Sequence, residues 1–223
     1  MKSNSLKIII IFFLALMKCD GNSGIAMQIN DSIQSIILQD VQIQYIVGHF
    51  TGEETNDTLR FQYSTDEEVE IKRIPSMEND WDSIIKWFYQ DYQINSFIAF
   101  GSDTLFFESA YNLFCFFNIG DVNLDGVDEF ALVVNWLDYS NINSCRIYSI
   151  CNHKFSLLKV FNIHESAFIQ EETQNTSFIG IKDYLEKENG VWKFHEYIND
   201  NNEKKEMTVL QLGECECGNK IHK

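Results

Sequence analysis

Oxygen-bearing side chains recur at alternate positions in the segment Asp121–Glu129. The segment reads DVNLDGVDE, so acidic or amide side chains stand at loop positions one, three, five and nine, and glycine stands at position six. A tight loop with this spacing can turn alternate side chains toward one centre. Calcium loops collect their oxygen ligands, about six to eight in number, in this way. The segment therefore predicts a calcium site.

The expected ligands follow from the positions in the loop. They are the side chains of Asp121, Asn123, Asp125 and Glu129 and the backbone carbonyl of Val127. Gly126 permits the sharp turn that a β-carbon would hinder, and Asp128 is expected to point outward or to support the ligands. Four neighbouring carboxylates repel one another unless a cation neutralises them, so we expect a structural Ca²⁺. The alternative is an acidic turn without metal.

The flanks of this loop distinguish it from a helix–loop–helix site. An EF-hand requires a bidentate glutamate at position twelve, which is Leu132 here, and the flanking runs Leu113–Ile119 and Phe130–Trp136 have the composition of strands. The segment Leu113–Trp136 resembles the FG-GAP or VCBS-type repeat, in which a DxNxDGxxD/E loop joins two β-strands. That resemblance implies a small exported protein of Bacteroidetes-like bacteria. The motif occurs once, so a full β-propeller is not expected.

Other residue types that support catalysis are scattered along the chain. The five histidines form neither an HExxH motif nor a short-range pair with metal spacing, and no GxSxG elbow or glycine-rich phosphate loop is present. Cys215-Glu216-Cys217 lacks the further ligands that a zinc site needs. The run at positions 136–141, WLDYSN, mixes aromatic and polar side chains and suits either carbohydrate or peptide binding at a loop tip or an ordinary turn. We predict no catalytic residues.

The elements that position the loop are mostly strands. Short β-rich runs are separated by polar turns. They are Val41–Phe50, Leu59–Tyr63, Val69–Ile74, Ser96–Phe100, Thr104–Phe107, Leu113–Ile119, Phe130–Trp136, Cys145–Cys151, Phe155–Phe161, Phe178–Glu186 and Val191–Ile198, with Met207–Leu212 as an edge strand. Asn189-Gly190 suits the tight turn of a final hairpin.

One amphipathic helix interrupts these strands. Trp81, Ile84, Ile85 and Phe88 have the spacing of a single helical face, and Asn79 or Asp80 can cap the first turn. The predicted fold is mainly β, in the α+β class, with antiparallel sheets, this helix and the calcium loop between two strands.

The first residues have the composition of a secretory signal. Met1–Lys7 contains two lysines and no acid, and Ile8–Met17 is an unbroken apolar run of ten residues. The segment before Cys19 resembles a bacterial lipoprotein signal, although Lys18 replaces the usual small residue. Lipidation of Cys19 after removal of the signal is one expectation, and ordinary cleavage after Ala26 is the other. Either leaves a single β-rich domain, residues 27–223, in the cell envelope, the periplasm or the medium.

Cysteine pairing remains open at this stage. An oxidising compartment permits disulfides, and an odd number of unblocked cysteines leaves at least one thiol free. Cys145 and Cys151 flank a strand that is too long for them to pair. Cys115 and Cys145 on neighbouring strands are one candidate pair.

The net charge of −16 limits the partners. An acidic surface repels phosphate backbones, so we expect no nucleic acid, and membrane contact only through a lipid anchor. The leading hypothesis is a binding or interaction module with an unknown protein or glycan partner. The alternatives are a secreted hydrolase acting on glycans or peptides through two carboxylates, and an immunity or inhibitor protein whose acidic face binds a basic partner.

Overall fold

The computed structural model describes residues 35–53, 55–168, 180–198 and 206–213. Contacts between Cα atoms divide the chain after Ser35, and every helix and strand described below belongs to the unit Ile36–Lys223. Over the described ranges, no helix has both the length and the apolar character needed to cross a membrane. Cys19 and the predicted cleavage sites lie outside the described residues.

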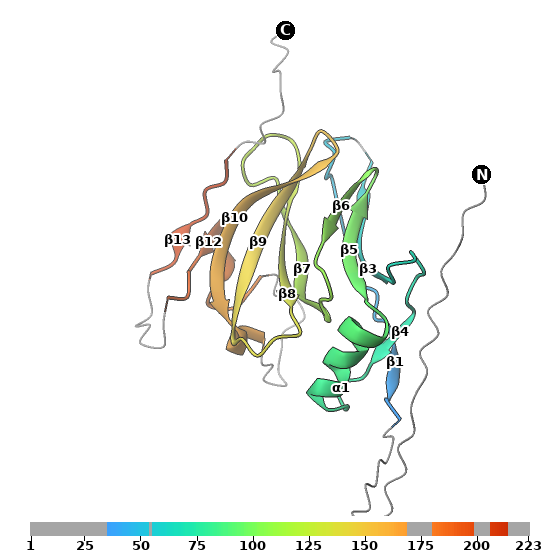
Figure 1. Ribbon diagram of the computed structural model, residues 1–223. Coiled ribbons are helices and arrows are strands. Elements are labelled where there is room, and N and C mark those ends of the chain that lie inside the picture. Colours follow the sequence, from blue (N-terminus) through green and yellow to red (C-terminus); the bar gives the residue numbers. More distant parts are fainter. Residues whose placement is uncertain (1–34, 54, 169–179, 199–205, 214–223) are drawn as a thin grey trace, which may run out of the picture. The chain divides into compact units, whose positions relative to one another are not determined.

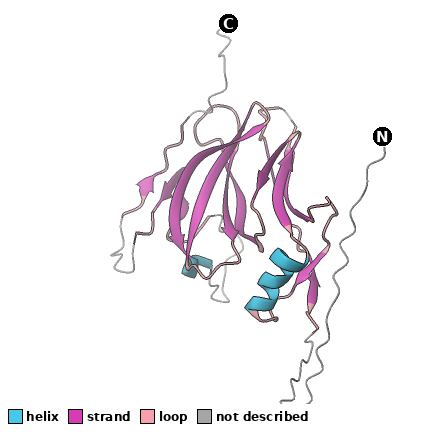
Figure 2. Cartoon of the chain, in the orientation of Figure 1, coloured by secondary structure: helices cyan, strands magenta, loops and turns pink. Residues whose placement is uncertain are grey.

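The predicted fold class is confirmed, because strands dominate the described part of the chain and all their pairings are antiparallel (Figures 1 and 2). One four-stranded sheet has the order β2 (Tyr45–Gly48), β3 (Asp57–Ser64), β5 (Asn95–Phe100) and β6 (Asp103–Phe106). A second has the order β10 (Lys154–His164), β9 (Ile142–Cys151), β8 (Glu129–Asn135) and β7 (Asn112–Gly120). A third sheet contains β11 (Leu185–Glu188), β12 (Val191–Phe194) and β13 (Thr208–Val209).

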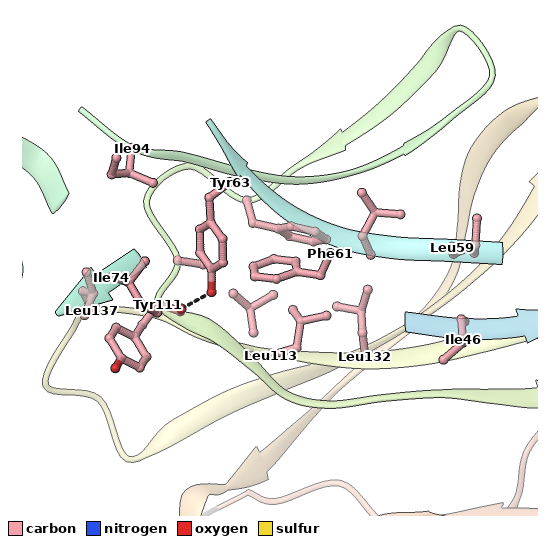
Figure 3. Close-up of a cluster of buried hydrophobic side chains, with 14 of the residues drawn as sticks. Ile46, Leu59, Phe61, Tyr63, Ile74, Ile94, Tyr111, Leu113, Leu132 and Leu137 are labelled. Atoms are coloured by element: carbon pink, nitrogen blue, oxygen red, sulfur yellow. Dashed lines mark hydrogen bonds between the residues drawn. The ribbon is translucent and has the colours of Figure 1, made fainter. Parts of the chain in front are cut away.

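The two four-stranded sheets pack face to face, with β2 beside β7 and β6 beside β10. Alternate residues of each strand point inward, as the period of two requires. Figure 3 shows this core, in which Leu59 and Phe61 from β3 meet Leu113 from β7 and Leu132 from β8. The hydroxyl of Tyr63 donates a hydrogen bond to the carbonyl of Tyr111 within the same core.

Strand β8 is buried on both faces, and its apolar residues run without alternation. Phe130, Leu132 and Val134 belong to the core between the large sheets, whereas Ala131 and Val133 belong to a second core. This second core also includes residues from β11 and β12. The indole N–H of Trp192 on β12 donates to the carbonyl of Ile119 at 2.7 Å. Sheet β11–β12–β13 is thus anchored immediately before the predicted calcium loop.

The predicted helix is confirmed as α1 (Trp81–Lys86), which continues into the π-helical turn η1 (Trp87–Asp91). Asp80 is the N-cap, and its Oδ1 accepts a hydrogen bond from the Ser83 N–H at 2.9 Å. Ile84 and Phe88 are fully buried against the first core. The helical spacing therefore identified the packed face correctly. A short 3₁₀ turn, η2 (Glu165–Phe168), follows β10.

The predicted strand Val41–Phe50 is wrong in extent, because only β2 is a strand within it. The chain crosses between sheets there. Val41 donates to Lys72, next to the two-stranded sheet of β1 (Leu38–Asp40) and β4 (Arg73–Pro75), whereas the carbonyl of Gln44 accepts from Phe61 on β3. The predicted strand at 69–74 is also wrong in extent, because only its last two residues belong to a strand, β4. Earlier in this segment, Glu70 forms an isolated bridge with Ser64.

The final hairpin has the predicted turn, with Asn189 and Gly190 both at positive φ between β11 and β12. The candidate disulfide between Cys115 and Cys145 is wrong, because both thiols are free. Cys115 on β7 and Cys145 on β9 both pair with Val133 on β8, which lies between them. Their Cα atoms are therefore separated by two inter-strand spacings, or about 9.6 Å. That exceeds the reach of a disulfide. Cys151 is disulfide-bonded, and Cys145 is not its partner, as predicted.

Candidate metal centre

The loop with the predicted ligands connects β7 to β8 at one end of the second sheet (Figure 1). Gly120 closes β7, where the strand register shifts, and Glu129 opens β8. Gly126 has a φ of 90°, which is the left-handed conformation expected from its position in the loop. The predicted strand–loop–strand context of this segment is confirmed.

Backbone N–H groups fix two of the loop carboxylates. Asp121 accepts hydrogen bonds from the N–H groups of Asp125 at 3.0 Å and Gly126 at 2.9 Å. Asp125 accepts one from the Val127 N–H at 3.0 Å. These bonds hold the loop in a tight turn around its acidic side chains, as hydrogen bonds from aspartate to nearby backbone groups commonly do.

Asp121, Asp125 and Glu129 converge on one point. Each contributes a carboxylate oxygen, and the three oxygens lie within 4.8 Å of one another. Asp125 is exposed, Asp121 is half-buried, and the side chain of Glu129 is fully buried with 0% exposure. This triad can hold a metal ion, because carboxylate oxygens at such separations can reach a common cation.

Glu129 has an unusual environment. Its Oε2 accepts a hydrogen bond from the Val122 N–H at 2.8 Å, but its Oε1 is buried with no hydrogen-bond partner. The pKa of Glu129 is raised to about 7, chiefly by burial and also by the charges of Asp125 and Asp121, while the backbone N–H groups of Val122 and Asn123 lower it. A buried, unpartnered carboxylate oxygen costs free energy unless a cation or a proton accompanies it.

The two remaining predicted ligands take part in the same turn. Oδ1 of Asn123 accepts from the Asp125 N–H at 3.1 Å, and its Nδ2 donates to Oδ2 of Asp125 at 3.0 Å. The same Nδ2 also donates to the carbonyl of Gly213 at 3.1 Å, which tethers the segment carrying β13. Ligation by the Asn123 side chain and by the Val127 carbonyl stays a prediction.

Asp128 supports the loop from behind instead of joining the triad. Its Oδ2 accepts from the His49 N–H at 2.9 Å and from Nδ2 of Asn118 at 2.8 Å, and its own N–H donates to the His49 carbonyl at 3.0 Å. These bonds join the loop to the turn after β2, on the other large sheet. Asp128 therefore supports the loop instead of pointing outward, and its support of metal ligands stays a prediction.

Sequence reasoning missed Gly48, His49 and Asn118 as parts of this arrangement. A β-carbon on Gly48 would collide with the side chains of Asn118 and Asp128. A glycine at the end of a strand was the one available signal, because it often marks a close approach of another group. Nothing in the sequence indicates that the approaching groups come from β7 and from the predicted calcium loop.

The imidazole rings of His49 and His164 make their hydrogen-bond contacts outside the triad. Nδ1 of His164 contacts the Ser166 hydroxyl at 2.9 Å, and Nδ1 of His49 contacts the Glu53 carbonyl at 3.2 Å, so His49 contacts Asp128 through its backbone. Cys215 and Cys217 lie outside the described residues. The run 136–141 connects β8 to β9, at the end of β8 opposite the metal loop.

Comparisons of this chain with protein-family models, with curated proteins and with solved structures each find no match. The resemblance to FG-GAP and VCBS-type repeats therefore stays a prediction.

Proposed function

We propose that the loop Asp121–Glu129 binds calcium, and that the ion acts as a structural clamp in a binding module. The observation that carries this proposal is the buried Oε1 of Glu129, which has no partner and lies close to two further carboxylates. A divalent cation at the convergence point removes both the repulsion and the cost of the unpartnered oxygen.

The donor set favours calcium over other metals. All the candidate donors are oxygens, which suit calcium, magnesium or manganese better than zinc, whose sites in proteins usually include histidine nitrogen or cysteine sulfur. Magnesium usually retains several waters and relies on one or two carboxylates, whereas calcium accepts carboxylate, amide and backbone oxygens from one flexible loop. Asp121, Asn123, Asp125, Glu129 and the Val127 carbonyl form a set of that kind.

A clamp role follows from what the loop contacts. Asp128 joins it to the turn after β2 through His49, and Asn123 joins it to Gly213 beyond β13. Holding the loop rigid would therefore stabilise contacts with two other sheets. At the level of the whole protein, we propose an exported cell-envelope module with a protein or glycan partner, in line with the apolar run Ile8–Met17.

A hydrolytic role for the triad has less support. Glu129 has the raised pKa that a general acid needs. Its side chain is fully buried, however, so a substrate cannot reach it. Neutralisation by a bound cation accounts for the same environment without requiring access.

Calcium titration followed by calorimetry and thermal unfolding tests the proposal. We expect the melting temperature to rise with calcium, because a ligand of the folded state at about 100 times its Kd stabilises by about 2.7 kcal/mol. Asp121→Ala with Asp125→Ala should abolish the rise. Glu67→Gln removes an exposed acid outside the loop and should leave it unchanged. An equal response to magnesium, or no response to either ion, would refute the calcium site.

A further inference from the structure

A hollow of about 470 Å³ lies at the end of β8 opposite the metal loop. It is lined by residues 139–142, by His164 and by residues 197–198. These segments are far apart in the sequence and meet where β9 begins and β10 ends. Small-ligand sites commonly have volumes of about 300 to 1,000 Å³, so the hollow is large enough for a small molecule or the end of a chain.

The lining has an unusual composition for a chain with a net charge of −16. It consists of Tyr139, Ser140, Asn141, Ile142, His164, Tyr197 and Ile198, with no lysine, arginine, aspartate or glutamate. The described lining therefore offers no fixed charge to pair with a phosphate, a carboxylate or an amine. Its chemistry suits a neutral ligand that has both apolar and hydrogen-bonding surface.

Tyr139 provides a pre-positioned aromatic surface. Its side chain is 77% exposed, yet its hydroxyl donates to Oδ1 of Asp82 at 3.1 Å and its ring lies 6.3 Å from that of Trp81. Helix α1 thus holds an exposed ring in place. An ordered, exposed aromatic ring loses little conformational entropy when a ligand packs on it.

Polar groups in the lining remain available for hydrogen bonds. Among the described residues, the side-chain amide of Asn141 has no partner, while its carbonyl accepts from the Glu165 N–H at 2.8 Å and fixes the loop to η2. Nδ1 of His164 accepts from the Ser166 N–H at 3.2 Å and contacts the Ser166 hydroxyl, which can donate to the same nitrogen, at 2.9 Å. In the neutral imidazole the proton then resides on Nε2, which leaves Nε2–H as a donor.

We propose that this hollow binds one or two rings of a neutral saccharide. The C–H face of a pyranose packs on the Tyr139 ring, and neighbouring hydroxyls pair with the Asn141 amide, which both donates and accepts, and with Nε2–H of His164. The proposal goes beyond calcium binding, because no lining residue belongs to the loop Asp121–Glu129. The two sites can therefore fail independently.

The test is NMR titration of the isotope-labelled full chain with neutral tetrasaccharides: maltotetraose, cellotetraose, mannotetraose and N-acetylchitotetraose. Parallel titrations use anionic tetragalacturonate and blocked neutral tetrapeptides. We expect at least one neutral saccharide to shift the amide signals of residues 139–142 and 164, with a Kd of about 0.1 to 10 mM. Calcium titration of the same sample reports on the other site separately.

Variants then assign the binding energy. Tyr139→Ala should weaken binding by about tenfold, which is about 1.4 kcal/mol, because the variant removes the aromatic contact. Tyr139→Phe keeps the ring and should retain most of the affinity. Tyr45→Ala removes a comparably exposed tyrosine on the other large sheet and should have no effect. The proposal is overturned if no neutral saccharide binds, if the shifts map elsewhere, if Tyr139→Ala binds normally, or if the charged sugar or the peptides bind as tightly.

Discussion

At the scale of single residues, Glu129 determines the chemistry of the loop. Its Oε2 is satisfied by the Val122 N–H, whereas its Oε1 is buried without a partner. Burying a neutral side chain in this place would cost much less free energy than burying a charged one. Without metal, the folded protein therefore favours the protonated form of Glu129, and a cation would favour the ionised form.

A pH dependence follows for the calcium-free protein. The pKa of Glu129 is raised from 4.5 to about 7 by folding. The folded state therefore keeps a proton that the unfolded state has lost, so stability from this group is complete below pH 4.5 and is lost as pH rises through 7. The loss amounts to about 3 kcal/mol, since a pKa difference of one corresponds to about 1.4 kcal/mol.

Glu129→Gln isolates this effect, because the amide does not titrate. In urea unfolding without calcium, we expect the variant to be more stable than the wild type at pH 8 and nearly equal at pH 4.5. With calcium the order should reverse, because only the wild type binds the ion. Parallel pH profiles for the two proteins in EDTA would contradict the assignment.

The site also depends on Gly48, because this position has no room for a side chain. Gly48→Ala should destabilise the protein by about 1 to 3 kcal/mol, because the new methyl group collides with Asn118 and Asp128. Gly213→Ala is a matched control, since a β-carbon there meets no atom within 4 Å. Equal unfolding midpoints for the two variants in urea would show that the contact is not restrictive.

At the scale of elements, the loop between β7 and β8 is a junction as well as the candidate metal site. Asp128 receives hydrogen bonds from β7 through Asn118 and from the turn after β2 through His49. Trp192 on β12 anchors the third sheet at Ile119, immediately before the loop. Three sheets therefore converge where a calcium ion would reduce local motion.

Asp128→Ala tests the junction without removing a member of the triad. The variant leaves the His49 N–H without its acceptor and removes one of the two acceptors of the Asn118 amide. We therefore expect a loss of stability of about 1 to 3 kcal/mol and a weaker, but still measurable, calcium affinity. Glu67→Ala serves as the control for loss of an exposed acid. Complete loss of calcium binding would instead place Asp128 among the ligands.

At the scale of the whole molecule, calcium binding and docking of the segment carrying β13 should be coupled. Nδ2 of Asn123 donates to the Gly213 carbonyl, and the Leu210 N–H donates to the Trp192 carbonyl at 2.8 Å. Fixing Asn123 in a metal site would hold this tether in place. Contacts that a ligand stabilises open less often, and hydrogen exchange measures that opening.

Asn123→Asp separates the tether from the ligand. The carboxylate keeps an oxygen for the metal but loses the N–H donor to Gly213. We expect calcium binding to be retained, whereas the calcium-dependent protection of the Leu210 amide against hydrogen exchange should disappear. If that protection persists in the variant, the side-chain tether does not carry the coupling.

Local patterns in the sequence determined several features of this protein. The spacing from Asp121 to Glu129 placed a tight acidic loop between two strands, and the spacing from Trp81 to Phe88 identified the buried face of a helix. Asn189-Gly190 identified the final turn. These features depend on residues a few positions apart, and dihedral preferences and side-chain periodicity act over that range.

Only the tertiary structure decided what surrounds those features. His49 reaches Asp128 across 79 positions, and the hollow beside Tyr139 requires the start of β9, the end of β10 and residues 197–198 to meet. Cys115 and Cys145 remain apart because β8 lies between their strands. Such contacts depend on the order and register of strands in a sheet. The alternation of apolar and polar side chains along a strand is the same whichever strand it pairs with. It therefore does not indicate the order of strands in the sheet.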